Sequence, residues 1–309
     1  MPDTAVRTHR IAVVRTDDEL IAVCLPYLRE GLAAGDLVVA LLAPAPAAHV
    51  RDQLPGVLVV DYPAATPREP ETVAAHTELL AQATAEGRRL RLLGQVRERQ
   101  PRAWDERLRG EIAHQHLWAD AAMASLCVYD RRVTPPEVLA TALLAHPEVL
   151  VDGAVRVNDA HRPPAELMAA LPVPAEPVQQ TTPVLAVDGA RSLPELRHAL
   201  QAALAGRLGS PDLDEDVHLA ASEIAANAFR HGGDLISARV WADGERVVVT
   251  ISDSGTRFDG CLSGFAPAHG ADLSRGGMGL WLARKLCDHV DTWRGPEGFT
   301  VRLTTAVRS

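Results

Sequence analysis

Three short stretches near the end of the chain decide its fold: EIAANAFRHG at residues 223–232, DSG at 253–255 and RGGMGL at 275–280. The first has helical spacing, so Glu223 and Asn227, four residues apart, share one helix face. The second directly follows an apolar run typical of a strand, and the third opens a further helical stretch. All three stretches therefore place polar groups or bare backbone at the ends of neighbouring elements, where they can point into one site.

The segments around these stretches predict an α+β domain with its helices on one face of a mostly antiparallel sheet. Ser210 and Pro211 provide a helix N-cap and a first helical residue, and Asp243-Gly244 is a strong hairpin signal. The expected elements are a strand at 184–187, helices at 193–208 and from 211 to the glycine pair at 232–233, strands at 236–241 and 246–253, a glycine-rich loop at 254–277, a helix at 278–287 and strands at 290–294 and 300–305.

Each of the three stretches resembles a motif of the GHKL family of ATP-binding domains, whose fold is the Bergerat sandwich. The N box is matched by Glu223 and Asn227, the first glycine box by Asp253 and Gly255, and the second glycine box by Gly277 and Gly279. A glycine-rich run by itself indicates only a flexible loop. The three motifs in the family's order indicate a nucleotide-binding domain.

The resemblance implies a role for each matched residue. Asn227 would bind Mg²⁺, and Asp253 would accept a hydrogen bond from the adenine amino group of ATP, with Thr300 supporting that contact. Gly255 would let the backbone approach the base closely, because glycine has no side chain. The remaining glycines, Gly276, Gly277 and Gly279, would direct backbone N–H groups at a helix N-terminus toward the phosphates.

Within the family, the sequence NAFRHG at 227–232 is similar to the anti-sigma-factor serine kinases of the RsbW and SpoIIAB type. In those proteins the N-box glutamate is the general base toward a serine or threonine of a STAS-type anti-anti-sigma protein. The resemblance therefore implies this role for Glu223, with Mg²⁺ offsetting charge on the phosphoryl group. A sigma factor as partner and a homodimer are implied in the same way.

Two features depart from the family pattern. Gly255 is followed by Thr256-Arg257 instead of a second glycine, and the candidate ATP lid at 258–274 contains Pro267 and lacks obvious anchoring residues. An ATP-dependent binding switch without kinase activity is therefore an alternative function. A sensor histidine kinase is a second alternative, disfavoured because His198 lacks the acid and proline that follow a phosphoacceptor histidine.

The first half of the chain predicts an α/β domain with a mainly parallel sheet covered by helices on both faces. We expect domains at residues 1–171 and 184–309, joined by a linker at 172–183 that is rich in proline and polar residues. The expected elements are strands at 9–14, 37–42, 57–60, 90–93 and 124–129, and helices at 17–30 and 72–86.

This half resembles the MEDS sensory domain, named from a regulator in methylotrophs and methanogens. The matching stretches are His9-Arg10-Ile11, PYLREGLAAGD at 26–36, CVYD at 127–130 and His146-Pro147. A MEDS domain fused to a short GHKL domain resembles the RsbA-type anti-sigma regulators of actinobacteria. The resemblance implies a sensory ligand but does not name it.

Cys127, Tyr129 and Asp130 form the candidate sensory pocket, with a core cysteine and a turn aspartate as an equally weighted alternative. His114 and His116, near Glu111, could suggest a metal site. Residues two apart on a helix do not face each other, however, so a solvated helix face is the favoured interpretation. His231 is expected only to cap its helix.

Composition excludes several function classes. The chain of 309 residues has a net charge of −9 and arginines scattered among acids, which disfavours direct nucleic-acid binding. No signal peptide or membrane-length apolar run is visible, so a cytoplasmic protein is expected. Lys285 is the only lysine and lies outside any Walker A pattern. The four cysteines form no C-x-x-C pair, so neither disulfides nor a zinc site is expected.

Overall fold

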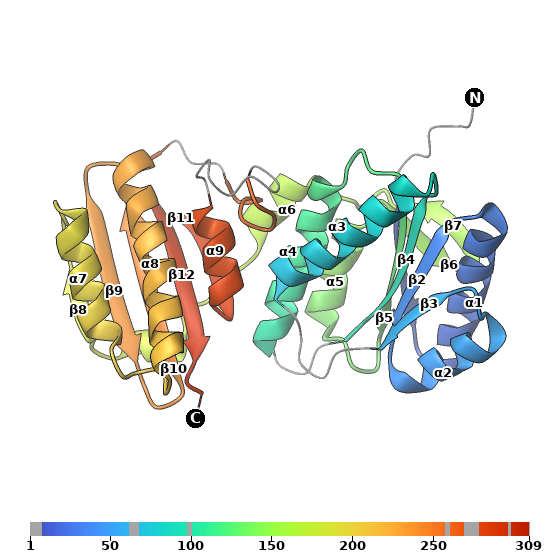
Figure 1. Ribbon diagram of the computed structural model, residues 1–309, viewed down its shortest axis with the longest axis horizontal. Helices are drawn as coiled ribbons and strands as arrows, with labels where there is room; N and C mark the ends of the chain where they lie inside the picture. The colour runs from blue at the N-terminus through green and yellow to red at the C-terminus, as the bar shows by residue number, and fades with distance from the viewer. Residues whose placement is uncertain are drawn as a thin grey trace. The chain divides into compact units, whose positions relative to one another are not determined.

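The computed structural model describes residues 8–61, 68–97, 101–256, 260–268, 278–295 and 298–308 (Figure 1). The chain divides into two compact units. One comprises residues 1–67 and 72–167, and the other comprises residues 68–71 and 168–309. Each unit has its own sheet and its own apolar core.

The N-terminal unit is built on a seven-stranded sheet with the order β3-β2-β4-β5-β1-β6-β7. All neighbouring strands are parallel except the β6–β7 hairpin, which confirms the predicted mainly parallel sheet. The strands are β1 (Thr8–Val14), β2 (Leu37–Leu42), β3 (Leu58–Asp61), β4 (Leu90–Val96), β5 (Met123–Asp130), β6 (Glu148–Val151) and β7 (Ala154–Val157).

Helices cover both faces of this sheet (Figure 1). They are α1 (Asp17–Ala34), α2 (Pro44–Gln53), α3 (Glu69–Ala85), α4 (Pro101–Leu117) and α5 (Pro136–Ala145), and the short helix α6 (Pro164–Ala170) follows the β6–β7 hairpin. Residues of α1 and α2 pack with β2 in one apolar cluster. Trp104 and Leu108 of α4 pack with Tyr129 of β5 and with α5 in another. Both clusters bury apolar side chains of the helices against the parallel strands. A parallel sheet covered by helices on both faces has apolar side chains on both faces of its strands.

The C-terminal unit has a five-stranded sheet with the order β11-β12-β10-β9-β8, in which every pairing is antiparallel. Its strands are β8 (Leu185–Val187), β9 (Ile236–Ala242), β10 (Arg246–Asp253), β11 (His289–Gly295) and β12 (Gly298–Ala306). Its helices α7 (Leu193–Leu204), α8 (Pro211–His231) and α9 (Gly279–Leu286) pack on one face of the sheet. The predicted α+β architecture with helices on one face is confirmed.

The start of α8 shows how the sequence sets these elements. The Ser210 side chain accepts a hydrogen bond from the backbone N–H of Leu213, and Pro211 occupies the first turn. This cap satisfies one of the free N–H groups at a helix start. The buried positions of the helix, which include Val217, Ala220 and Ile224, then join the core over the sheet.

The segment expected to be a linker contains a short 3-10 helix, Pro177–Gln180, that packs on the opposite face of the C-terminal sheet. Val178 is buried there against Trp241 and Val248. The Gln179 side chain accepts a hydrogen bond from Arg302 at 2.8 Å. The proline-rich composition correctly disfavours α-helix and strand, but this segment is anchored to the sheet.

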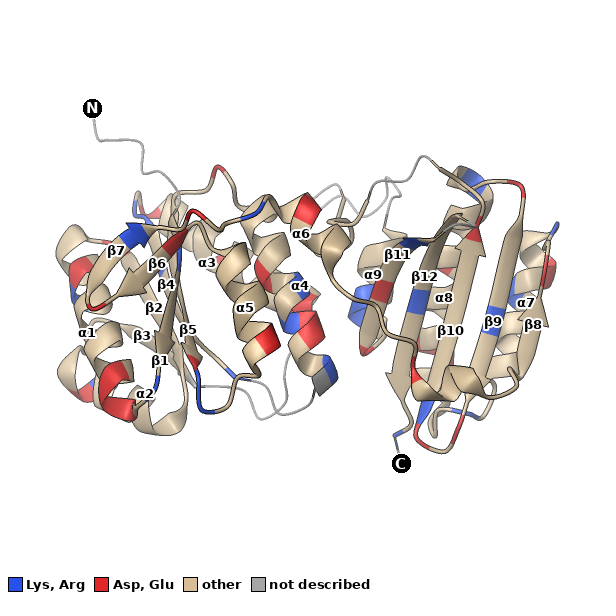
Figure 2. Ribbon diagram, turned by 180° about the vertical axis from the view of Figure 1, so that it is seen from behind, with Lys and Arg blue, Asp and Glu red and all other residues tan. Residues whose placement is uncertain are grey.

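Basic and acidic residues are interspersed in both units (Figure 2). Across the described residues, none of the helices is long and apolar enough to cross a membrane.

Candidate functional site

A cavity of about 190 Å³ lies between helices α8 and α9 and strands β10 and β12. Of the residues proposed from sequence, Asn227, Asp253 and Gly255 line it together. The remaining lining is largely apolar, with Ile224, Ala228, Ile251, Leu280, Phe299 and Val301. The cavity thus presents an apolar slot with a few polar groups at its border, which is the usual character of a small-molecule site.

Asp253 is fixed at the end of β10 by its own backbone surroundings. Its Oδ1 accepts hydrogen bonds from the N–H of Gly255 at 2.8 Å and of Gly233 at 3.3 Å. Among the described residues, no hydrogen bond reaches its Oδ2. A carboxylate held in this way keeps an acceptor available for a donor of a bound molecule.

Glycines allow the backbone to pass this close to Asp253. A Cβ on Gly232 would lie 2.6 Å from the Asp253 Cγ, and a Cβ on Gly255 would lie 2.6 Å from its Oδ1. Both separations are too short for non-bonded atoms, so both positions need glycine. Gly255 was proposed to allow close backbone approach. Gly232, interpreted from sequence only as a helix stop, has the same packing role.

Asn227 is held against the start of α9. A Cβ on Gly279 would lie 2.4 Å from the Asn227 Nδ2, so the amide occupies the space that a side chain at Gly279 would need. Gly279 is the first residue of α9, one residue after the helix start predicted from sequence. Gly276 and Gly277, proposed as phosphate contacts, lie outside the described residues, as do residues 258–259 and 269–274 of the proposed lid.

Replacing Gly279 with alanine is expected to displace Asn227 and to weaken Mg²⁺-dependent ATP binding while the fold is retained. Gly244→Ala is the matched control, because a Cβ there meets no atom within 4 Å. Calorimetric titration of both variants with ATP, with and without Mg²⁺, measures the effect. Equal affinity in the two variants would show that the Asn227–Gly279 contact is not part of the site.

Glu223 lies one turn before Asn227 on α8 but does not line the cavity. Its side chain is 37% exposed, and its carboxylate lies 3.7 Å from the Arg197 guanidinium of α7. The structure therefore places the proposed binding residue Asn227 in the cavity and the proposed base outside it. An exposed base is accessible to a macromolecular substrate.

The structure does not bring Thr300, proposed to support the adenine contact, into the lining of this cavity. Its hydroxyl lies 2.9 Å from the Ser252 hydroxyl, and neither residue lines the cavity. Successive side chains of a strand point to opposite faces, so the flanking residues Phe299 and Val301 line the cavity instead.

His231 also lines the cavity, although the sequence suggested only a helix cap. It follows Asn227 by four residues, so the same helical spacing that joins Glu223 to Asn227 places it on this face. That spacing is the signal that could have identified it.

The proposed sensory residues Cys127, Tyr129 and Asp130 have separate surroundings in the structure. Tyr129 is fully buried and stacks near Trp104, with ring centroids 6.5 Å apart. The Asp130 carboxylate is bound by Arg132, whose side-chain hydrogen bonds lower the Asp130 pKa. None of the three lines a described cavity of the unit.

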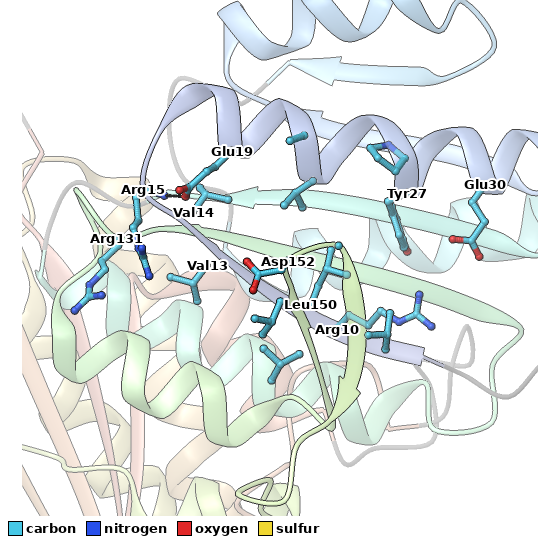
Figure 3. Close-up of a pocket in the computed structure, with 17 residues that line it drawn as sticks. Arg10, Val13, Val14, Arg15, Glu19, Tyr27, Glu30, Arg131, Leu150 and Asp152 are labelled. Carbon is cyan, nitrogen blue, oxygen red and sulfur yellow. Dashed lines mark hydrogen bonds between the residues drawn. The ribbon is translucent and has the colours of Figure 1, made fainter.

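A different cavity, of about 640 Å³, lies in the N-terminal unit between α1, β1 and the β6–β7 hairpin (Figure 3). Charged residues of both signs border it: Arg10, Arg15, Glu19, Glu30, Arg131 and Asp152. No sequence motif indicated this cavity, because its lining comes from segments far apart in the chain.

Comparison with known proteins matches each half of the chain to a protein family model. Residues 187–305 match the family model of the histidine kinase-like ATPase domain. Residues 8–147 match the model of MEDS, the methanogen/methylotroph DcmR sensory domain. A comparison with curated proteins found no matching relative.

Among solved structures, the chain is similar to the RsbU and RsbW domains of Rv1364c from Mycobacterium tuberculosis, at 21% sequence identity and a TM-score of 0.28. The match covers 40% of this chain and 32% of that chain. The two family matches, together with the two folds described above, show that this chain combines an N-terminal MEDS sensory domain with a C-terminal histidine kinase-like ATPase domain.

Proposed function

We propose that this protein is an RsbA-type anti-sigma regulator. Its C-terminal domain binds Mg-ATP and phosphorylates a serine or threonine of a STAS-type anti-anti-sigma protein, which controls a sigma factor, and its MEDS domain supplies the input. The observation that carries the proposal is the cavity in which Asn227, Asp253 and Gly255 converge, with Glu223 one turn away on the same helix.

The residues of the cavity fit an adenine base. Leu280, Phe299 and Val301 offer apolar surfaces for the ring, and Asp253 offers a fixed acceptor for its amino group. A volume of about 190 Å³ is smaller than the roughly 300–1,000 Å³ of sites that enclose a whole drug-sized ligand. The cavity therefore suits the base, with Asn227 and the first turn of α9 next to it for the rest of the nucleotide.

Asn227 would hold Mg²⁺ through its side-chain oxygen, the ligand type that this ion prefers. The ion would offset the negative charge of the phosphoryl groups. Glu223 would accept the proton of the hydroxyl group on the protein substrate, and its exposure suits that contact. Arg197, 3.7 Å from Glu223, would orient the carboxylate.

A second candidate is an ATP-dependent binding switch without phosphoryl transfer. The observation in its favour is the ion pair between Glu223 and Arg197, because this contact engages the proposed base outside the cavity. In this function ATP would stabilise a partner-binding surface.

The full chain incubated with labelled ATP, Mg²⁺ and candidate STAS-type proteins separates these functions. Serine or threonine phosphate on the partner supports the proposed kinase. ATP binding without transfer to any partner supports the binding switch. Phosphate on a histidine of the protein itself would contradict both and indicate a sensor histidine kinase.

Asp253→Asn is expected to weaken ATP binding about tenfold or more, because losing the acceptor of a buried donor costs about 1–3 kcal/mol. Asp243→Asn is a matched control. The exposed Asp243 likewise accepts a hydrogen bond from the backbone N–H two residues on, at 2.8 Å, but lies in a hairpin turn outside the cavity. Calorimetry that finds unchanged ATP affinity in Asp253→Asn would remove the adenine assignment.

A further inference from the structure

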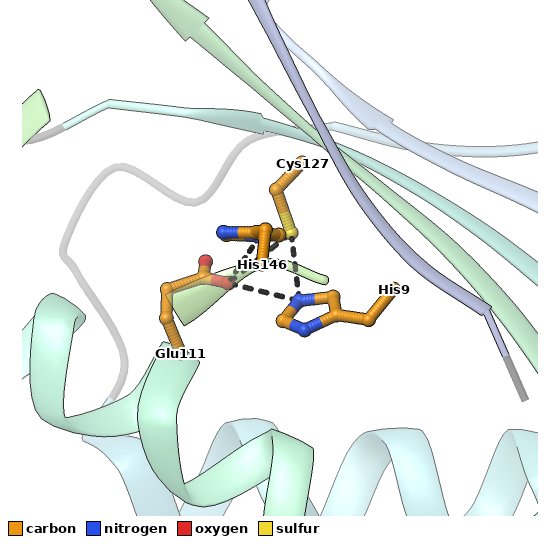
Figure 4. Close-up of side chains that lie close together, drawn as sticks. All are labelled: His9, Glu111, Cys127 and His146. Carbon is orange, nitrogen blue, oxygen red and sulfur yellow. Dashed lines mark hydrogen bonds and ion pairs between the residues drawn. The ribbon is translucent and has the colours of Figure 1, made fainter. Parts of the chain in front are cut away.

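Four polar side chains from distant parts of the chain meet inside the MEDS domain (Figure 4). They are His9 on β1, Glu111 on α4, Cys127 on β5 and His146, which directly follows α5. His9, Glu111 and His146 are 2%, 4% and 0% exposed. One potential metal ligand atom from each residue lies within 4.8 Å of all the others.

Hydrogen bonds fix how the two imidazoles face this cluster. His146 Nδ1 lies 2.7 Å from the carbonyl oxygen of Ala142, and His9 Nδ1 lies 3.0 Å from the Gln115 Oε1. Because these oxygens can only accept, their positions favour the tautomer in which each Nδ1 carries the proton and donates it. In the neutral ring, each Nε2 then directs a lone pair into the cluster.

This arrangement is the one that metal-ligating histidines show, since the ring nitrogen away from the metal usually donates to an oxygen acceptor. The His146 Nε2 is fully buried and makes no hydrogen bond with the described residues. It lies 3.5 Å from the Glu111 Oε2. A lone pair aimed at a carboxylate oxygen is unfavourable unless a proton or a metal cation lies between them.

The separations fit a tetrahedral ion. Ligand bonds of about 2.0–2.3 Å in a tetrahedral zinc site place neighbouring ligand atoms about 3.3–3.8 Å apart. Glu111 Oε2 lies 3.4 Å from His9 Nε2 and 3.2 Å from Cys127 Sγ. Cys127 Sγ lies 3.6 Å from His9 Nε2. Four of the six separations, including the 3.5 Å between His146 Nε2 and Glu111 Oε2, are therefore close to those of such a site, and the other two are no longer than 4.8 Å.

We propose that His9, Glu111, Cys127 and His146 bind one divalent transition-metal ion of the Zn²⁺ class. Imidazole, thiolate and carboxylate are the ligands that Zn²⁺ takes in proteins. Binding converts the Cys127 thiol to a thiolate and releases one proton, which the thiol now directs toward Glu111. The positions 9, 111, 127 and 146 are too far apart for any sequence spacing rule, which is why the sequence favoured no zinc site.

The test uses the full chain, stripped with a chelator and titrated with Co²⁺ and then Zn²⁺. We expect one ion per chain, visible absorption typical of tetrahedral Co²⁺, and a thiolate-to-cobalt charge-transfer band in the near ultraviolet. Cys127→Ser should abolish that band. Cys24→Ser is the matched control, because Cys24 is a buried thiol of the same domain whose pKa burial raises to about 12.

A second variant keeps all four ligands and changes only the support of His9. Gln115→Leu should weaken metal binding by about 10- to 100-fold, the usual cost of losing an outer-shell partner. Competition with a chromophoric chelator measures this change while circular dichroism monitors the fold.

Two outcomes would overturn the proposal. If the folded, stripped protein takes up neither ion, the cluster is an ion pair between a protonated His9 and Glu111. If Cys127→Ser and Gln115→Leu bind metal with native affinity and spectrum, the metal lies elsewhere in the chain. Neither outcome depends on ATP or on a protein partner.

Discussion

Glu223→Gln is expected to reduce phosphoryl transfer to the partner protein by about 100- to 10,000-fold, the usual contribution of a general base. ATP should still bind, because Glu223 does not line the cavity. Glutamine keeps the size of the side chain and a polar contact for Arg197. Single-turnover transfer of labelled phosphate measures the rate, and calorimetry measures ATP affinity in the same variant.

Two further variants test whether the effect is specific to the carboxylate of Glu223. Glu215→Gln removes an exposed carboxylate from the same helix and should leave transfer unchanged. Asn227→Ala, in contrast, should lose Mg²⁺-dependent binding and transfer together, because Asn227 lies in the cavity. Native transfer by Glu223→Gln would contradict the general-base role, and tight ATP binding without any transfer by the native chain would leave the binding switch in its place.

Arg302→Leu is expected to destabilise the C-terminal domain by about 3–5 kcal/mol, because it leaves the charge of Asp291 buried without its cation. Arg302 and Asp291 are 1% and 0% exposed, and two guanidinium nitrogens lie 2.8 and 2.6 Å from the Asp291 Oδ2. Calorimetric unfolding of the full chain should show the transition of this domain at a lower temperature.

A matched substitution on the same sheet tests whether burial is the cause. Arg239 pairs with Asp188 at 2.8 Å, but the two side chains are 32% and 74% exposed. Arg239→Leu should therefore cost only about 0–1 kcal/mol. The double variant Arg302→Met/Asp291→Leu should recover much of the lost stability, since it removes both buried charges. Equal costs for the two arginines would contradict this account.

The fold of the ATPase domain could be predicted because its signals are local. Ser210-Pro211 sets the start of α8, the glycine pair after His231 sets its end, and Asp243-Gly244 sets the β9–β10 hairpin. The β6–β7 hairpin was missed, although Asp152 and Gly153 form its turn with positive φ values of 49° and 76°. The Asp152-Gly153 pair is the same hairpin signal as Asp243-Gly244. The strands on either side of Asp152-Gly153 have only four residues each, so the pattern of a hairpin is weak there.

The residues of the candidate sites could likewise be predicted where their placement depends on local spacing, and not where it depends on strand register or strand order. Asn227 and His231 reach the cavity between α8 and α9 through helical spacing, which can be read from the sequence. The face of β12 that Thr300 occupies depends on strand register, and a shift of one residue reverses it. The cluster of Cys127 with His146 depends on the order of strands in the parallel sheet, which no local pattern specifies.

The short helix at Pro177–Gln180 has a consequence for the modularity of the protein. Trp241 donates its indole N–H to the Thr181 carbonyl at 3.2 Å, and Gln179 accepts from the buried Arg302. An ATPase fragment beginning at residue 184 would lose both partners and uncover the apolar surface over Val248. A recombination event that exchanges the sensory domain therefore preserves the ATPase only when the crossover falls before Glu176.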